Sequence, residues 1–552
     1  MLCRSNQTAA VAAACLVVAA TTRAEIVYSG AINPDPPQEG QSLLVGDQAE
    51  ATLEINGGSS FSTGTADDEQ LGIGFAKGFN TGDGLVRVTG SGSTLRTENL
   101  RVGLAGRATF VAEAGAEVYA GNFYLSNESN RGNTATVTGD GTLMEIVGAF
   151  EMNSGSMTDG NVFTVTDGAT LRFTGDSLRS IATPNNTVAT FNVSNGARVE
   201  FADTAGNEML IGWYDGAQGT MNVTGGSTVE LGFTRLGGFG SAQGVLNVSG
   251  DGSRFSTVGN NSLVVGRQAR GELNVFDGGV VTAGADLNIA GESGARGTAT
   301  VSSSSSVTST NWFNVGVGDR SEGTLNILDG SSVTSGSRFR LAGGGDSIGT
   351  VNIDGGSTLT INERFYLNAL GSSTANLNVT EGIVDVADLT ITGLRGGVSN
   401  IYLGSRSAIN LVKDIYVSYN SGSQTNFEFE LTSDDHGTPR SGTITLFGLA
   451  FLSGQSSLDF DLASDISFEQ GDSFILFDYA NTRWNGKTFD NVGDDEILLA
   501  GGYQFLINYD DLIGIDDYAV TATVVVPEPA SVVLLTAGVG LIVSRRRRKA
   551  IA

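Results

Sequence analysis

A segment of about 26 residues recurs along most of this 552-residue chain and limits its possible folds. Each copy contains "LNV" or a close variant, as in GTLNILDGSSV from Gly323 and GTVNIDGGSTL from Gly349. The last apolar residue of this motif marks the register at Val223, Val248, Val275, Val301, Ile327, Ile353 and Val379. Looser copies upstream have their marks at Ile55, Val88, Ala112, Val137, Val165 and Val193, which makes about thirteen copies. Such a period predicts one structural unit per copy, stacked on its neighbours.

Each copy contains three short apolar pieces, which in the copy from Gly323 are residues 325–327, 332–333 and 339–341. Within each piece the apolar residues alternate with others, which is the period of a strand with one buried face. Gly, Asp, Asn and Ser fill the gaps, where the chain must turn. Between residues 38 and 526 the only prolines are Pro184 and Pro439, as expected if most backbone N–H groups donate to a ladder.

Three strands per repeat predict an all-β fold, a right-handed parallel β-helix of about thirteen rungs. At ~4.8 Å per rung the rod would be about 60 Å long. The alternatives are a β-propeller and a stack of β-sandwiches; a propeller blade needs four strands in ~40 residues, which the shorter period disfavours. We expect a lead-in over residues 25–40 and the β-helix over residues 41–399.

The regular repeat is lost after residue 400, where Phe, Tyr and Asp become frequent, as in NFEFELTSDD and GDSFILFDYA. The apolar alternation persists there. Because a β-helix must close its open end, residues 400–525 are predicted to form a C-terminal β cap or a small β-sandwich.

An Asn stands between two apolar residues in most copies and is predicted to point outward. These residues are Asn192, Asn222, Asn247, Asn274, Asn326, Asn352 and Asn378. They should stack as a ladder of amides, interrupted by Glu54, Arg87, Thr136 and Thr300. We interpret this face as a solvated surface; the alternative is a flat polar surface that binds sugars or ice.

The first 24 residues have the features of a secretory signal, namely an early cation, an apolar run and small residues before Ala24. Cleavage between Ala24 and Glu25 by signal peptidase would remove Cys3 and Cys15, the only cysteines. The mature chain would then have no disulfide, thiolate metal site or cysteine nucleophile. Lipidation of Cys15 is the alternative.

The last 27 residues, 526–552, combine Pro527, Glu528 and Pro529 with an apolar run over residues 530–544 and a basic cluster. The basic cluster is Arg545, Arg546, Arg547, Arg548 and Lys549. The apolar run is shorter than the ~20 residues of a durable transmembrane helix. Cations at its end would stay in the cytoplasm, so the segment predicts a short transmembrane helix used in transit. A plain tail anchor is the alternative.

This order of Pro-Glu-Pro, apolar run and basic cluster resembles the PEP-CTERM sorting signal of exported Gram-negative proteins. The repeats over about residues 40–385 also resemble the β-strand repeats shared by autotransporter passengers and PEP-CTERM proteins. The resemblance implies recognition by an exosortase, a membrane-embedded transpeptidase-like enzyme, and processing near the Pro-Glu-Pro. It also implies passage through the inner membrane to the cell surface or extracellular matrix, and a link to exopolysaccharide.

The charge of the chain disfavours nucleic acid as a partner. Its formal net charge is −28, with 31 cations and 59 acids. Seven of the cations lie in the first 24 residues or the basic cluster, so residues 25–544 hold 24 cations against 59 acids, a net charge of −35. Phosphate binding depends on clustered Lys and Arg, which this segment lacks.

No catalytic, cofactor-binding or metal-binding residue is predicted. Pectate lyases and polygalacturonases are right-handed β-helices, and a glycosidase needs two nearby carboxylates. The acidic pairs lie where the strand pattern is weakest: Asp67-Asp68, Asp434-Asp435, Asp494-Asp495, Asp510-Asp511 and Asp516-Asp517. The sole histidine, His436, stands in DDHG, which faintly resembles a polygalacturonase site, but we interpret it as part of an exposed turn. Phosphate-loop and calcium-nonapeptide motifs are absent from the sequence.

These observations favour an exported, non-enzymatic surface or matrix protein with a structural or adhesive role. The expected partners are signal peptidase, an exosortase-type enzyme, and exopolysaccharide or other surface proteins. The alternatives are an exopolysaccharide-binding module and a polysaccharide lyase or glycosidase.

Overall fold

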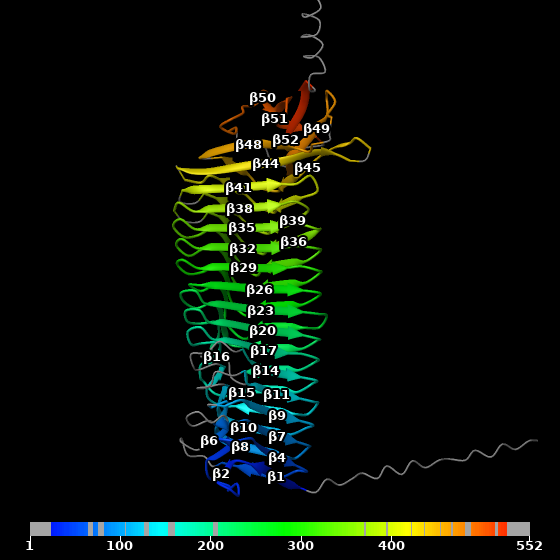
Figure 1. The fold of residues 1–552 in the computed structure, drawn as a ribbon. Coiled ribbons are helices and arrows are strands. Elements are labelled where there is room, and N and C mark those ends of the chain that lie inside the picture. The colour runs from blue at the N-terminus through cyan, green and yellow to red at the C-terminus, as the bar shows by residue number, and fades with distance from the viewer. Residues whose placement is uncertain are drawn as a thin grey trace, which may run out of the picture.

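The protein is a parallel β-solenoid of about thirteen turns, which confirms the predicted repeat architecture (Figure 1). This computed structural model describes residues 24–526 apart from 64–69, 76–81, 105, 126–131, 153–159, 202–207, 369–370, 394–395, 421, 435, 453, 465–466, 481–486 and 514–516. The described residues form strands and turns but no helix. Successive strands stack in three columns along the rod, which we call faces 1, 2 and 3.

Face 1 is an 18-stranded sheet that holds the "LNV" motifs. Its strands are β1 (Glu25–Gly30), β4 (Ala51–Asn56), β7 (Gly84–Thr89), β9 (Ala108–Glu113), β11 (Thr134–Thr138), β14 (Asn161–Thr166), β17 (Val188–Val193), β20 (Gln218–Thr224), β23 (Gln243–Ser249), β26 (Arg270–Phe276), β29 (Arg296–Val301), β32 (Glu322–Ile327), β35 (Ile348–Ile353), β38 (Thr374–Val379), β41 (Gly397–Leu403), β44 (Ser423–Ser433), β45 (Pro439–Ser441) and β48 (Gln455–Leu462). From β4 to β44 every neighbouring pair of these strands is parallel.

Face 2 follows face 1 in each turn and carries the second apolar piece of the repeat. Its strands are β5 (Ser60–Ser62), β8 (Thr94–Val102), β10 (Glu117–Leu125), β12 (Leu143–Ile146), β15 (Thr170–Phe173), β18 (Arg198–Phe201), β21 (Thr228–Leu231), β24 (Arg254–Thr257), β27 (Val280–Ala283), β30 (Ser306–Ser309), β33 (Ser332–Ser335), β36 (Ser357–Ile361), β39 (Gly382–Val386), β42 (Ala408–Leu411), β46 (Thr443–Leu446) and β49 (Ser473–Ala480).

Face 3 carries the third apolar piece. Its strands are β2 (Ile32–Asn33), β3 (Leu43–Asp47), β6 (Gln70–Phe75), β13 (Phe150–Met152), β16 (Arg179–Ile181), β19 (Glu208–Ile211), β22 (Phe233–Leu236), β25 (Leu263–Val265), β28 (Leu287–Ile289), β31 (Phe313–Val315), β34 (Phe339–Leu341), β37 (Phe365–Leu367), β40 (Thr390–Thr392), β43 (Ile415–Val417) and β47 (Ala450–Leu452). The long strands β8 and β10 belong to both faces, because each pairs with face 2 strands at its start and face 3 strands at its end.

The core lies inside the three faces and is filled by the alternate residues of every strand. In β32, Leu325 and Ile327 are fully buried, whereas Thr324 and Asn326 between them point outward. Equivalent residues stack from turn to turn, so that the ring centroids of Phe313 and Phe339 are 5.2 Å apart. Each such buried ring contributes about 2 kcal/mol to stability. No single turn could bury its own face, so the stacking of turns creates the core.

A glycine stands second in each of β20, β23, β26, β29, β32 and β35, where two backbones approach closely. A Cβ on Gly323 would lie 2.3 Å from the backbone nitrogen of Gly316, which forms the corner after face 3. Gly316 itself has a φ of 62°. Serines stabilise the corner between faces 1 and 2, where the Ser331 N–H donates to Ser357 Oγ at 3.2 Å. The Gly and Ser of the repeat are therefore corner residues.

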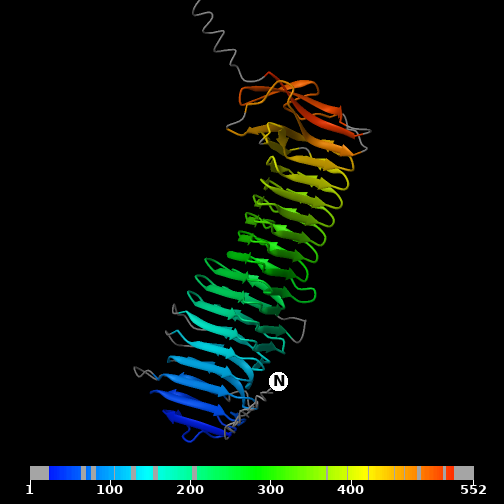
Figure 2. The ribbon, with the colours of Figure 1, turned by 90° about the vertical axis from the view of Figure 1, so that its right-hand side faces the viewer.

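Antiparallel strands close both ends of the rod (Figure 2). At the N-terminal end, within the predicted lead-in, β1 pairs antiparallel with β4 and β2 with β3. At the C-terminal end, parallel stacking continues past residue 399, through β44–β48 and β46–β49. Three antiparallel cap strands then extend the sheet from β49. β52 (Asp517–Val526) pairs with β49, β51 (Tyr503–Leu512) pairs with β52, and β50 (Glu496–Ala500) pairs with β51. The repeat becomes hard to recognise after residue 400 because the β44–β45 hairpin lengthens one turn.

The predicted transmembrane helix over residues 530–544 lies outside the described residues. Among those that are described, none forms a helix with the length and apolar character needed to cross a bilayer.

Candidate binding surface

The amide ladder on face 1 is present, as the repeat predicts. Asn222 Nδ2 donates to Asn192 Oδ1 at 2.8 Å, and Asn247 Nδ2 donates to Asn222 Oδ1 at 2.8 Å. Asn274 continues the run with a bond of 2.9 Å to Asn247. Most of these amides therefore donate to one neighbour and accept from the next. This internal bonding supports the interpretation of face 1 as a solvated, self-bonded surface.

Thr300 interrupts this ladder, also as predicted, because it pairs with Asn274 on one side and Asn326 on the other. Asn326 Nδ2 donates to Thr300 Oγ1 at 3.3 Å, and the amide chain resumes beyond it with Asn352 and Asn378.

A second ladder, which the sequence analysis did not identify, lies beside the first on the same face. It begins at Asn376, two residues before Asn378 in β38. Asn400 donates to Asn376 and Asn426 donates to Asn400, both at 2.8 Å. Ser457 Oγ extends the run with a bond of 2.9 Å to Asn426. The signal was present in the sequence, since these residues keep nearly the same period.

Face 3 differs from face 1 because aromatic side chains occupy its outward positions near the C-terminal end. The strand register places Tyr366, Ile391, Tyr416 and Phe451 in one line along the rod. We call Tyr366, Tyr416 and Phe451 the aromatic row. The rings of Tyr416 and Phe451 are stacked with centroids 4.7 Å apart, and Tyr419 meets Tyr416 edge-on at 5.6 Å.

Exposed apolar side chains adjoin the half-buried aromatic row at the corner between faces 2 and 3. Val412, Phe447 and Leu449 follow or precede the strands of this corner and are all exposed. A contiguous exposed apolar patch on a soluble protein commonly marks a binding surface.

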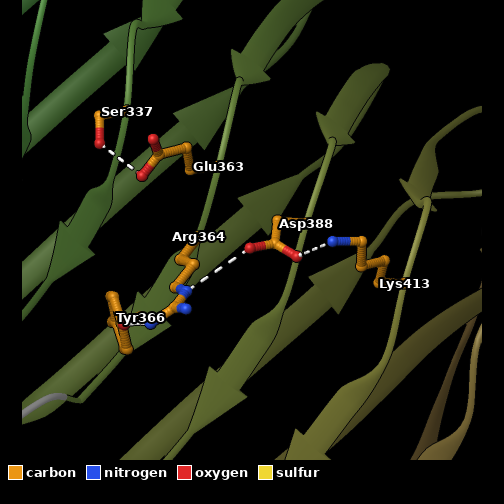
Figure 3. Close-up of polar contacts among 6 residues, drawn as sticks. All are labelled: Ser337, Glu363, Arg364, Tyr366, Asp388 and Lys413. Carbon is orange, nitrogen blue, oxygen red and sulfur yellow. Dashed lines mark hydrogen bonds and ion pairs between the residues drawn. The ribbon is translucent and has the colours of Figure 1, made fainter.

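A polar border runs along the same corner (Figure 3). Lys413 Nζ lies 2.6 Å from Asp388 Oδ1, and Arg364 Nε lies 3.5 Å from Asp388 Oδ2. Arg364 also donates to Tyr366 Oη at 3.4 Å, while Ser337 donates to Glu363 at 2.7 Å. The hydrogen bond from Lys413 lowers the pKa of Asp388, and the hydrogen bond to Tyr366 raises the pKa of Arg364. The two ion pairs with Asp388 thus fix the positions of both cations beside the aromatic row.

Arginines stack on tryptophans farther toward the N-terminal end of face 3. The Cζ of Arg340 lies 4.1 Å from the ring centroid of Trp312. At the corner that follows face 3, Arg267 Cζ lies 4.9 Å from the ring of Trp213, which is buried, and the guanidinium also contacts Glu292 at 3.0 Å. Burial lowers the pKa of Arg340. Face 3 therefore combines half-buried aromatic rings with fixed donors at several positions along the rod, which suits extended ligands with both apolar and hydroxylated surfaces.

His436 lies in an exposed turn between β44 and β45, which confirms the interpretation made from the sequence. Its backbone N–H donates to Asp434 Oδ1 at 2.9 Å, as does the N–H of Thr438 at 2.9 Å. The backbone donors at Thr438 and His436 lower the pKa of Asp434 to about 2. Asp434 is thus a turn-stabilising carboxylate that also pairs with Arg440 at 3.0 Å.

The residues predicted for processing lie at or beyond the two ends of the described chain. Ala24 is exposed and immediately precedes β1, which begins at Glu25. Pro527, Glu528 and Pro529 and the whole basic cluster lie outside the described residues. Across the described ranges, no group of three or more His, Cys, Asp or Glu is placed to hold a metal ion.

The aromatic row and the Arg–Trp stacks were missed by the sequence analysis, because an aromatic residue between two buried ones looks like an ordinary strand residue. Only the register, which aligns such residues from different turns, reveals the row. No protein-family model matches this chain, and no curated protein matches it.

Proposed function

We propose that this chain is an exported, non-enzymatic, right-handed β-helix that serves as a structural or adhesive rod at the cell surface or in the extracellular matrix. The observation that carries the proposal is the unbroken parallel stacking of face 1 from β4 to β44. Such a rod holds its side chains in repeating rows over its whole length, which suits a spacer or an adhesive surface.

We further propose that the segments at the two ends of the chain direct its export to the cell surface. Signal peptidase would cut between Ala24 and Glu25, which leaves β1 intact. The segment over residues 530–544 would form a short helix in the inner membrane, with the basic cluster in the cytoplasm. An exosortase-type enzyme would then act near Pro527, Glu528 and Pro529 and release the rod.

The test is to express the full chain in its own host and to identify its termini by mass spectrometry. We expect surface protein that begins near Glu25 and contains no peptide from residue 532 onward. Replacement of residues 527–529 by three alanines should leave full-length protein in the inner membrane. Pro439→Ala, in the β45 strand, is the control for loss of a proline and should be processed normally. Mature surface protein that retains its basic cluster would contradict release and support a tail anchor.

The second candidate is an exopolysaccharide-binding module, favoured by the half-buried aromatic row beside Arg364 and Lys413. A glycan array and the host's own extracellular polysaccharide provide the ligands. The double variant Tyr416→Ala, Phe451→Ala should lose binding at least about tenfold, roughly 1.4 kcal/mol. Tyr28→Ala, a substitution of an exposed tyrosine in β1 at the other end of the rod, is the matched control. Equal binding by the double variant would eliminate the aromatic row as the site.

A further inference from the structure

The C-terminal cap exposes two large aliphatic side chains on its outermost strand. Ile497 and Leu499 in β50 are 50% and 69% exposed, whereas Leu498 and Ala500 between and beside them pack against the core. Among the described strands, β50 pairs only with β51, so it is also an edge of the cap sheet. We call Ile497 and Leu499 the aliphatic edge. Native proteins rarely leave an apolar edge uncovered.

The aliphatic edge lies beside the point where the chain leaves the cap. Val526, the last residue of β52, pairs with Gln504 in β51, and Gln504 pairs with Leu499 in β50. The three residues therefore form one row across the sheet. Because neighbouring strands are ~4.8 Å apart, the backbones of Val526 and Leu499 are separated by about 10 Å.

Only three residues separate Val526 from the apolar run that begins at residue 530. Even fully extended, this link of Pro527, Glu528 and Pro529 spans at most about 14 Å. Once the apolar run is inserted in a bilayer, the exit point of β52 is held close to the membrane surface. Because the link is short, the neighbouring β50 strand also has little freedom to move away from the membrane surface.

We propose that the aliphatic edge inserts into the lipid interface of the membrane that holds residues 530–544, and so seats the cap on that membrane before release. This inference rests on the proposed membrane segment. Burial of Ile497 and Leu499 among lipid chains would remove from water the apolar surface that the free rod exposes. The contact would steady the processing site at a fixed height above the bilayer.

The carboxylates beside the edge are held by donors of the cap itself. Glu496 accepts the N–H of Gly493 at 2.7 Å, and Asp494 accepts the N–H of Tyr509 at 3.1 Å. An acidic border of this kind is repelled by anionic lipid, so the test uses vesicles of zwitterionic phosphatidylcholine.

The experiment places one fluorophore at a time on the full chain in which Cys3 and Cys15 are replaced by serine. The labelled variants are Leu499→Cys at the edge, Leu512→Cys as the matched control and Thr536→Cys in the apolar run. Leu512 is 65% exposed and lies eight residues after Gln504 along β51, about 26 Å from the row of Leu499. Each protein is reconstituted in phosphatidylcholine vesicles that carry a nitroxide-labelled lipid.

We expect a blue shift and nitroxide quenching at positions 499 and 536, and neither at position 512. Quenching at 536 without quenching at 499 would overturn the lipid contact and leave the membrane segment standing. Absence of quenching at 536 would overturn the membrane segment and, with it, this inference. A blue shift at 499 in vesicle-free solution would show that the tail or a second copy covers the edge, which also overturns the proposal.

Discussion

At the scale of single residues, Arg179 is a charged side chain inside an otherwise apolar core. It occupies the inward position that Phe150 and Met209 fill in the neighbouring turns. Its guanidinium lies 5.1 Å from the ring of Phe173 and 4.8 Å from the ring of Phe201. Burial lowers the pKa of Arg179 to about 10. The residue is still protonated at neutral pH, so the desolvation of this buried charge lowers the free energy of unfolding of the rod.

Replacement of Arg179 by methionine should therefore leave the free energy of unfolding unchanged or raise it by about 1 kcal/mol, because a buried charge gives way to an apolar side chain. Arg179→Ala, which opens a cavity, should lower it by about 3 kcal/mol. Chemical denaturation followed by circular dichroism measures both. Equal losses in the two variants would show that the guanidinium is a net stabiliser.

The pH dependence of Arg179 has a definite sign. Its folded pKa of about 10 lies below the ordinary pKa of an arginine, so the folded state binds this proton less tightly than the unfolded state. The destabilisation by Arg179 is present in full below about pH 10 and fades as the pH rises above that value toward the ordinary pKa of arginine. The stability of the methionine variant relative to the natural chain should decrease over the same range.

The amide ladder predicts a position-dependent cost at the residue scale. Asn247 both donates to Asn222 and accepts from Asn274, whereas Asn192 only accepts from Asn222 among the bonds of this ladder. Asn247→Ala should cost about 1–2 kcal/mol and Asn192→Ala about half as much, because a net hydrogen bond contributes about 1 kcal/mol. Hydrogen exchange of the backbone in β20 and β26 reports the loss locally. Equal losses would argue against a cooperative ladder.

At the scale of elements, the unit of the rod is one turn of three strands. Gly323 in β32 is in register with Gly349 in β35, 26 residues later. A deletion of residues 323–348 therefore joins Glu322 to the residue that normally pairs with Gly323. The remaining strands keep their faces and their inward side chains.

This shortened chain should fold with a similar thermal midpoint, and the rod should lose about 4.8 Å of length. Deletion of residues 323–335 is the control, because it removes the β32 and β33 strands and leaves β34 without its own turn. That chain should unfold at a clearly lower temperature, since the downstream strands lose register. Circular dichroism and small-angle scattering distinguish the outcomes, and equal damage by both deletions would contradict stacked turns.

The strands of a regular turn could be predicted from the sequence, because burial alternates along β32 as the apolar residues do. The continuation of parallel stacking through β46 and β49 could not, because the β44–β45 hairpin breaks the period. The aromatic row was also hidden, since nothing in a single turn shows that Tyr416 and Phe451 stack on each other. Local pattern determines which residues point inward, whereas outward neighbours depend on long-range register.

At the scale of the whole molecule, the charge of residues 25–544 is −35, and ion pairs offset it only locally. Raising the salt concentration from about 10 mM to about 150 mM shortens the screening length from about 30 Å to about 8 Å. We expect the thermal midpoint to rise by about 2–4 °C, the equivalent of roughly 1 kcal/mol, because repulsion between distant acids weakens. Equal responses to sodium and potassium chloride would identify screening as the cause. A lower midpoint would mean that surface ion pairs outweigh the repulsion.

The stacking direction has a mechanical consequence. Backbone hydrogen bonds between successive turns run along the rod axis, so tension applied to the two ends loads the turns in series. The least stable turn then unfolds first, and its 26 residues extend to about 90 Å while the neighbouring turns stay folded. If the rod links a cell to a surface, it would lengthen stepwise under flow. Each step would limit the tension on the attachment, which a rigid rod of the same length could not do.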